Sequence, residues 1–159
     1  MKKNQQGFTL IELLVVIAIF ALMANITMVS LNKAKRESRD TKRLSDINQL
    51  RSALQLYSTE KLSYPVGDNV ALGVDSRATL DTRGWATNPP TSPIFMPTVP
   101  RDPRMVNLPE DACTDASTNP CDYGYTFLSD DSYVIYFYLE DNVSNMAAGI
   151  HSATKNSIY

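Results

Sequence analysis

The chain has 159 residues, of which 15 are basic and 17 acidic, so its formal net charge is −2. Proteins that bind nucleic acid usually show a strongly basic patch, and this near-neutral balance gives no indication of one. About 130 residues remain outside the one long apolar segment, enough for one hydrophobic core and too few for two. The composition therefore favours a single small domain and argues against nucleic acid as a partner.

The apolar segment spans residues 8–31, and Glu12 is its only charged residue. A helix needs about 20 residues to cross the hydrocarbon core of a bilayer, so this segment is long enough to span one. A secretory signal would carry small residues spaced A-x-A behind the apolar core, but the sequence there reads FALMANITM. A simple membrane anchor explains the length but not Glu12, because an acid in a membrane helix costs about 2.5–3.5 kcal/mol. Such a residue usually has a partner.

The residues around Glu12 resemble a known processing motif. Gly7-Phe8-Thr9-Leu10-Ile11-Glu12, followed by LLVVIAIF, is similar to the prepilin leader of type IV pilins and type II secretion pseudopilins. The resemblance implies that a membrane-bound prepilin peptidase cleaves between Gly7 and Phe8, and that Phe8 is then N-methylated. It also implies partners: like subunits in a homopolymer, the peptidase, the inner-membrane assembly machinery and, before assembly, membrane lipid.

Cleavage would create a partner for Glu12. It exposes a positive amine on Phe8, and in a bundle of like helices Glu12 of one subunit can face the Phe8 amine of its neighbour. Each charge then neutralises the other in a dry environment where either alone is costly. The pairing favours one axial register between neighbours, as a single buried polar residue does in a coiled coil. We therefore interpret Glu12 as an assembly residue and not a catalytic one.

The basic residues on the two sides of the apolar segment predict opposite orientations in the membrane. Lys2 and Lys3 favour a cytoplasmic N-terminus, whereas a count of the lysines and arginines in residues 33–43 favours the opposite. Following the leader, we expect a single-pass inner-membrane protein with its head outside the cytoplasm, which later enters an extracellular or periplasmic filament. The basic flank is expected to lie beside lipid headgroups.

The helix is predicted to continue beyond the membrane. Neither glycine nor proline occurs between Gly7 and Pro65, and apolar residues recur at steps of three and four, which predicts a helix from Phe8 to about Lys61. Fewer than three heptads support a coiled-coil seam, so the apolar stripe is expected to pack on the head. The stripe comprises Leu44, Ile47, Leu50, Leu54 and Tyr57, and the ion pairs predicted on the exposed surface are Lys33/Glu37, Arg36/Asp40 and Lys42/Asp46.

The region after the helix is predicted to be irregular at first and then to form strands. Tyr64-Pro65 ends the helix, and a proline-rich loop follows to about Asn119. Strands are predicted at residues 123–128 (YGYTFL) and 133–140 (YVIYFYLE), joined by a turn at residues 129–132. A lone hairpin is marginally stable, so it must pack on the helix, and a third strand is expected from the tail or the loop. The residues expected to hold the loop in place are Trp85, Ile94, Phe95 and Met96.

The predicted fold class is α+β, with one long N-terminal helix packed on a small antiparallel β-sheet. The segment Pro100-Arg101-Asp102-Pro103 and the helix end at Tyr64-Pro65 are similar to major pseudopilins, so the resemblance implies a pilin-like head. The predicted divisions are a leader (1–7), a transmembrane and assembly helix (8–31), an amphipathic helix of the head (32–63), a long Pro-rich loop (64–119), and a β-hairpin with the C-terminal tail (120–159).

Cys113 and Cys121 are the only cysteines, and a polar loop separates them. With a membrane anchor and an outward-facing head, they are expected to form a disulfide. A metal site would need more than two cysteine ligands, and the one histidine, His151, is far away in the sequence. No cofactor is expected, although calcium stays an alternative because major pseudopilins hold it in a loop after the sheet. The candidate calcium ligands are Asp130, Asp131, Glu140 and Asp141, but the glycine- and aspartate-rich loop of those proteins is missing, since residues 142–150 read NVSNMAAGI.

No enzyme active site is recognised in the sequence, because no phosphate-binding loop is visible and no serine or cysteine has a recognisable base nearby. The predicted function is that of a structural subunit that polymerises through its N-terminal helix into a type IV pilus-type filament after leader cleavage. The alternative is a pseudopilin of a type II secretion or DNA-uptake filament. A hypothesis of a different class is a monomeric, membrane-anchored binding domain.

Overall fold

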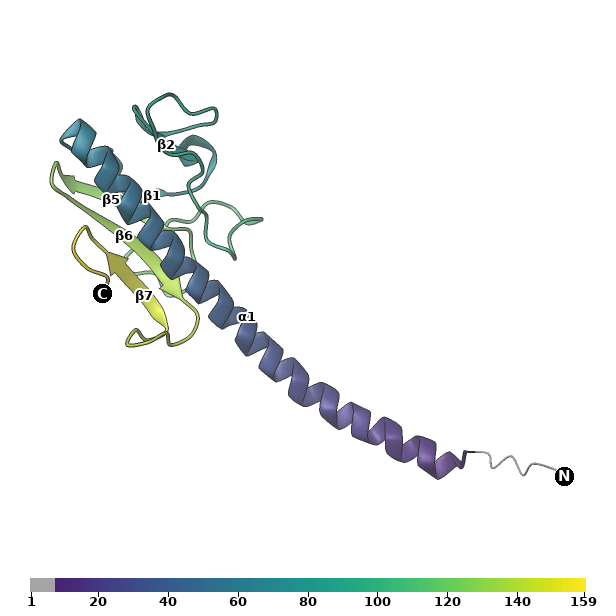
Figure 1. Ribbon diagram of the computed structural model, residues 1–159. Helices are drawn as coiled ribbons and strands as arrows, with labels where there is room; N and C mark the ends of the chain where they lie inside the picture. The colour runs from purple at the N-terminus through teal and green to yellow at the C-terminus, as the bar shows by residue number, and fades with distance from the viewer. Residues whose placement is uncertain (1–7) are drawn as a thin grey trace. The chain divides into compact units, whose positions relative to one another are not determined.

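The computed structural model describes residues 8–159, which fall into two compact units (Figure 1). The first unit ends at Arg36 and contains the N-terminal part of helix α1 (Leu10–Lys61). The second, Glu37–Tyr159, contains the rest of α1 and the strands of the head. The predicted leader, including Gly7, lies outside the described residues.

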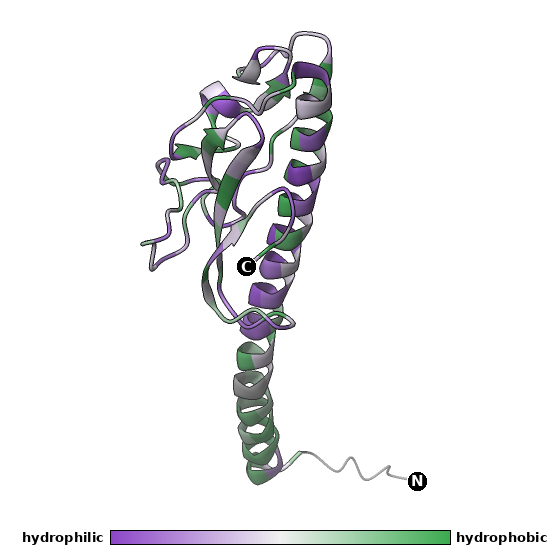
Figure 2. Ribbon diagram, turned by 90° about the vertical axis from the view of Figure 1, so that its left-hand side faces the viewer, coloured by the Kyte–Doolittle hydropathy of each residue, from purple (hydrophilic) through white to green (hydrophobic). Residues whose placement is uncertain are grey.

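Helix α1 begins two residues later than predicted, at Leu10, and ends at Lys61 as predicted. Its N-terminal part is apolar on all sides (Figure 2), and Phe8, which precedes it, is 88% exposed. Among the described residues, this is the one helix whose length and composition would allow it to cross a membrane. A helix that is hydrophobic all round must be covered by lipid or by other apolar helices.

The main sheet of the head has four antiparallel strands in the order β1-β5-β6-β7. The predicted hairpin is confirmed, because β5 (Gly124–Ser129) pairs with β6 (Ser132–Leu139). Both predicted sources supply a further strand. The loop contributes β1 (Val70–Ala71) on one side of the hairpin, and the tail contributes β7 (Gly149–Ala153) on the other.

The core lies between α1 and one face of this sheet (Figure 1). Along β6, every second side chain is buried, which is the alternation expected of a strand with one face on a core. The predicted stripe of α1 is confirmed: Ile47, Leu50 and Leu54 are fully buried, and Leu44 packs against the core from its edge. The buried side chains opposite them include Tyr123, Tyr125, Tyr133, Ile135 and Phe137.

The loop predicted to be irregular instead contains a second sheet. Strands β2 (Thr79–Asp81), β3 (Gly84–Ala86) and β4 (Ile94–Met96) pair in the order β3-β2-β4, preceded by a short 3-10 helix, Asp75–Arg77. Each strand has three residues, so none is long enough to show the period-2 pattern by which strands are recognised. The segment that joins β3 to β4, residues 87–93, contains three of the prolines that predicted a loop.

Aromatic contacts attach the second sheet to the core. The Trp85 ring lies 5.0 Å from that of Tyr125, and the Phe95 ring lies 5.2 Å from that of Tyr57, both edge to face. Met96 is buried, so three of the four residues expected to hold the loop do contact the core. The prediction was wrong for Ile94, which is 46% exposed.

Two leucines of α1 give a matched test of this packing. Leu54 is fully buried, whereas Leu56 is 61% exposed. We expect Leu54→Ala to lower the free energy of unfolding by about 2–5 kcal/mol, through lost burial and the cavity left behind. Leu56→Ala should change it by less than about 0.5 kcal/mol. Denaturant unfolding of the full chain in mild detergent measures both, and equal losses would contradict this arrangement of the helix.

Candidate assembly site and the ionic network of the head

The start of α1 is held by a reciprocal pair of side-chain contacts. Glu12 Oε2 accepts hydrogen bonds from the backbone N–H of Thr9 at 2.9 Å and from the Thr9 hydroxyl at 2.7 Å. In return, the backbone N–H of Glu12 donates to Thr9 Oγ1 at 3.3 Å. Thr9 is thus the N-cap residue and Glu12 the third residue of the helix, which is the arrangement of a capping box.

This capping box gives Glu12 a local role that the assembly hypothesis did not include. A helix start leaves backbone N–H groups without helical partners, and the Thr9–Glu12 pair satisfies two of them. Both bonds from Thr9 end on one carboxylate oxygen, and an ionised carboxylate can accept about four hydrogen bonds. Glu12 can therefore cap its own helix and still accept a bond from a neighbouring subunit. The spacing Thr-x-x-Glu before an apolar run was the signal that could have identified Thr9.

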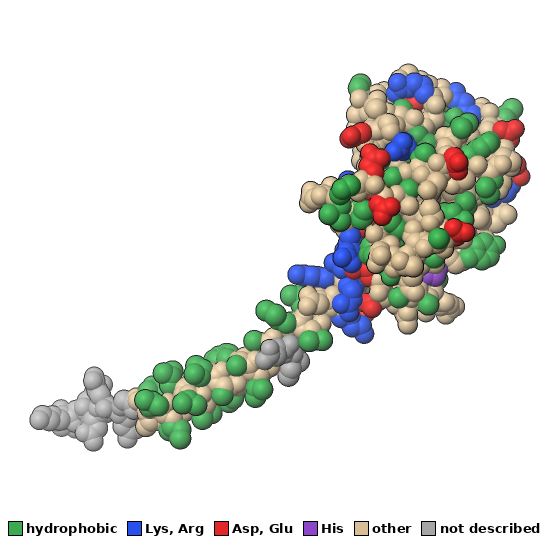
Figure 3. Space-filling view, turned by 180° about the vertical axis from the view of Figure 1, so that it is seen from behind, with side chains coloured by type: hydrophobic (Ala, Val, Ile, Leu, Met, Phe, Trp, Pro, Cys, Tyr) green, Lys and Arg blue, Asp and Glu red, His purple; other side chains and the backbone are tan. Residues whose placement is uncertain are grey.

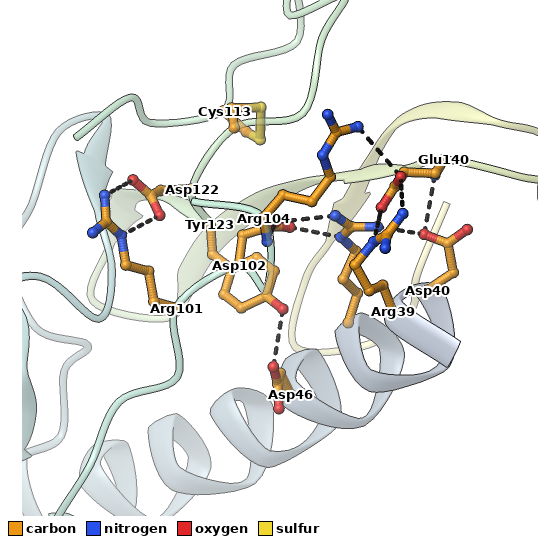
Figure 4. A network of polar contacts seen from close by, with 12 residues as sticks. Arg39, Asp40, Asp46, Arg101, Asp102, Arg104, Cys113, Asp122, Tyr123 and Glu140 are labelled. Carbon is orange, nitrogen blue, oxygen red and sulfur yellow. Dashed lines mark hydrogen bonds and ion pairs between the residues drawn. A yellow bond between two sulfur atoms is a disulfide. The ribbon is translucent and has the colours of Figure 1, made fainter. Parts of the chain in front are cut away.

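A buried arginine, Arg43, lies at the centre of a polar network in the head; its partners Asp40, Asp102 and Glu140 are labelled in Figure 4. The side chain of Arg43 is fully buried, and its guanidinium donates to Asp102 through Nε at 2.6 Å and through Nη2 at 3.0 Å. Its Nη1 also donates to Asp40 at 2.6 Å and to Glu140 at 2.7 Å. Burial lowers the pKa of Arg43, but its acidic partners outweigh burial and raise it. Arg43 is therefore a charged group inside the head whose charge is compensated on several sides.

Glu140 binds two further arginines. Both carboxylate oxygens of Glu140 accept bonds of 2.6 Å from Arg39, and Oε2 also lies 3.3 Å from Nη1 of Arg104. Burial by itself raises the pKa of Glu140, but the hydrogen bonds from Arg39 and Arg43 prevail and lower it from 4.5 to about 2. Three arginines therefore face three acidic side chains, those of Asp40, Asp102 and Glu140. The carboxylate of Glu140, one of the calcium ligands considered from the sequence, is thus bound by arginines in this structure.

In two of the ion pairs predicted on the exposed surface of the helix, Arg36/Asp40 and Lys42/Asp46, the acid is buried and not exposed. Asp40 is fully buried, and besides Arg43 it accepts bonds from the backbone N–H groups of Glu140 and Asp141 at 3.0 and 2.9 Å. Asp46 is also buried and accepts a 3.0 Å bond from the Tyr123 hydroxyl. Burial raises the pKa of Asp46, and that bond partly opposes the rise. Both acids accept hydrogen bonds from segments that are distant in the sequence. A spacing of four residues along the helix cannot reveal such partners.

The predicted disulfide between Cys113 and Cys121 is confirmed, with the two Cα atoms 5.1 Å apart. The adjacent Asp122 is fully buried and forms a two-pronged ion pair with Arg101, at 2.8 and 3.0 Å. The backbone of Asp122 also accepts a 2.8 Å bond from the N–H of Cys113. The disulfide and this ion pair together hold the segment that leads into β5.

Comparison with known proteins identifies the N-terminal motif. A family model described as the prokaryotic N-terminal methylation motif matches residues 2–24. The chain carries a prepilin-type N-terminus. Among the curated proteins, the type II secretion system core protein G of Dickeya chrysanthemi is 31% identical over 111 residues, which cover 70% of this chain and 65% of that protein. No solved structure gives a significant match.

Two shorter matches lead to the same group of proteins. The core protein G of Aeromonas hydrophila is 38% identical over 64 residues, 40% of this chain and 45% of that protein. The type IV wide pilus major component PilA4 of Thermus thermophilus is 31% identical over 77 residues, 48% of this chain and 59% of that protein. This pilin-like chain therefore spans between 45% and 65% of the length of these three relatives. The resemblance to pilins and pseudopilins is confirmed, as is the α+β fold.

The ionic network can be tested with two arginines that differ in burial. Arg43→Met leaves the buried carboxylates of Asp40 and Asp102 uncompensated, so we expect a loss of about 3–5 kcal/mol in the free energy of unfolding. Arg104→Met should cost less than about 1 kcal/mol, because Arg104 is half exposed and its contact with Glu140 is long. Denaturant unfolding in mild detergent compares the two, and a similar loss in both variants would contradict a central role for Arg43.

Removal of the disulfide should destabilise the head without changing the N-terminal site. The cysteines are eight positions apart, and closing a loop of this size contributes about 2–3 kcal/mol in the chain-entropy view. We expect the double variant Cys113→Ser/Cys121→Ser to unfold several degrees below the parent chain in the absence of reductant. Reductant should lower the melting temperature of the parent chain toward that of the variant. An unchanged melting temperature on reduction would contradict the prediction.

Proposed function

We propose that this chain is a pilin-like structural subunit that is cleaved between Gly7 and Phe8, N-methylated on Phe8 and polymerised through its N-terminal helix. The observation that carries the proposal is Glu12, an acid at the start of an apolar helix whose side chains are exposed in the single chain. An exposed apolar helix must be covered by lipid before assembly and by like helices in the filament. The same helix therefore serves as membrane anchor before assembly and as the shared core of the filament afterwards.

The capping box makes the proposed assembly contact more specific. It holds the Glu12 carboxylate beside the first turn of α1, where Phe8 precedes the helix by two residues. Once the leader is removed, the Phe8 amine of a neighbouring subunit could donate to this carboxylate. Two charges that are each costly in an apolar environment would then compensate each other. The pair sets the axial position of each new subunit, while the apolar surface supplies most of the binding.

The proposed partners differ before and after assembly. Before assembly the subunit lies in the inner membrane, with its head outside the cytoplasm, where it meets the prepilin peptidase and the assembly machinery. Afterwards it contacts copies of itself or similar subunits. We propose no catalytic role and no resident cofactor.

A secretion filament is the second candidate, and one observation favours it over a surface pilus. The match to the Dickeya chrysanthemi protein named as a type II secretion core protein covers 70% of this chain, whereas the match to the pilus protein covers 48%. The longer match extends beyond the helix into the head, and the head is the part exposed on the outside of a helix-centred filament. Electron microscopy of intact cells for surface fibres, in strains with and without the gene, distinguishes the two candidates.

Glu12→Gln separates the two roles of Glu12. Glutamine also forms capping boxes, so the helix start should be kept, while the charge that would pair with the Phe8 amine is lost. We expect normal membrane insertion and normal leader cleavage, with filament yield reduced at least tenfold. Intact-mass spectrometry reads the processed N-terminus, and quantitative microscopy of sheared filaments reads assembly.

The matched control is Glu60→Gln, which removes the same charge from an exposed position near the other end of α1. It should assemble like the parent chain. Normal filaments from Glu12→Gln would refute the charge pairing. A mature protein that retains Met1 would refute processing itself and would favour the monomeric, membrane-anchored binding domain.

A further inference from the structure

A short run of basic residues follows the apolar part of α1 directly. Lys33 and Lys35 are exposed and Arg36 is partly exposed, all within the first unit of the structure. Figure 3 shows basic side chains gathered on the helix just after its apolar stretch. In the sequence these residues belong to one basic flank together with Arg39, Lys42 and Arg43.

The structure divides this flank into two sets with different roles. Arg39 and Arg43 belong to the second unit and are bound there by Glu140, Asp40 and Asp102. Their charges are therefore compensated inside the head. Lys42 is exposed but belongs to the second unit, so the exposed basic side chains next to the apolar part are those of the other set, residues 33–36.

The length of the apolar part places that set at a defined depth. From Leu10 to Leu31, α1 rises about 32 Å, which matches a hydrocarbon core about 30 Å thick. Lys33 and Arg36 then lie roughly 3 to 8 Å further along the helix axis. The headgroup layer adds roughly 5 to 8 Å on each side of the hydrocarbon core. The three basic side chains thus fall at the level of the lipid phosphates.

We propose that Lys33, Lys35 and Arg36 form a basic collar that binds the phosphate groups of anionic phospholipids while the subunit resides in the membrane. The collar rests on the membrane-anchored stage of the proposed function. Lys33 and Arg36 also interact within the chain, but an ammonium has three donors and a guanidinium five, so each can bind a phosphate as well. Charge complementarity selects anionic lipid over zwitterionic lipid, and the collar holds the end of the span at the membrane surface until assembly.

Selectivity for spin-labelled lipids tests the collar. The full-length protein is reconstituted in phosphatidylcholine vesicles that contain trace spin-labelled phosphatidylglycerol or phosphatidylcholine, and the motionally restricted fraction of each label is measured. Because a basic side chain at an anionic surface contributes about a factor of five, we expect phosphatidylglycerol to be preferred at least about fivefold. The preference should be largely lost at 1 M salt, where the Debye length is about 3 Å.

Two double variants remove the same charge from different places. Lys33→Gln/Lys35→Gln should reduce the preference to less than half, and the addition of Arg36→Gln should abolish it. Lys61→Gln/Lys155→Gln, which changes two partly exposed lysines of the head, should leave the preference unchanged. Equal association of both lipids with the parent protein would overturn the collar, and so would an equal loss of preference in the two double variants.

Carbonate extraction separates this test from the proposed function. A protein that resists extraction but shows no lipid preference refutes the collar alone, and the membrane-anchored stage then stands. A protein that carbonate releases from the vesicles refutes the membrane-anchored stage, and the collar with it.

Discussion

The head depends on the compensation of one buried charge. Arg43 comes from the helix, Asp102 from the long loop and Glu140 from the end of β6, and these segments are far apart in the sequence. A buried guanidinium without partners would be very costly, so the three segments must come together if the helix is to pack with Arg43 inside. Buried apolar contacts would tolerate small shifts between the helix and the sheet, whereas the paired donors of Arg43 accept few geometries. The network therefore fixes the position of the helix relative to the sheet, which hydrophobic packing alone would define less sharply.

A similar requirement acts at the other end of α1. Glu12 lies in an apolar segment, and its first compensation is local, through Thr9. That contact provides partners for backbone N–H groups at the helix start, and the carboxylate can still accept another hydrogen bond. In the head the acidic partners of Arg43 are supplied by the fold itself, whereas at the N-terminus a partner of opposite charge would come from another subunit. Under the proposed function, this contrast separates a head fixed by its own ion pairs from a helix start whose carboxylate is left for contact with another subunit.

Much of the fold could be predicted because its main elements have strong periodic signals. The stripe from Leu44 to Tyr57 has the helical period, and β6 alternates strictly between buried and half-buried side chains. Strands β2, β3 and β4 could not be predicted, since each has only three residues and the segment between β3 and β4 is rich in proline. The capping box was readable, because Thr9 and Glu12 are close in the sequence. The pairing of Arg43 with Asp102 was not, because nothing in the sequence relates positions so far apart.

The sequence by itself determined the long helix, its apolar N-terminal part, the acid at its start and the processing motif around Gly7 and Phe8. These features are local, and their chemistry follows from neighbouring residues or from the helical period. Only the tertiary structure decided which charged residues face water and which are buried. Asp40, Arg43 and Asp46 look like surface charges in the sequence, yet the fold buries all three. The reason is that the cost of burying a charge depends on partners that only the folded chain brings together.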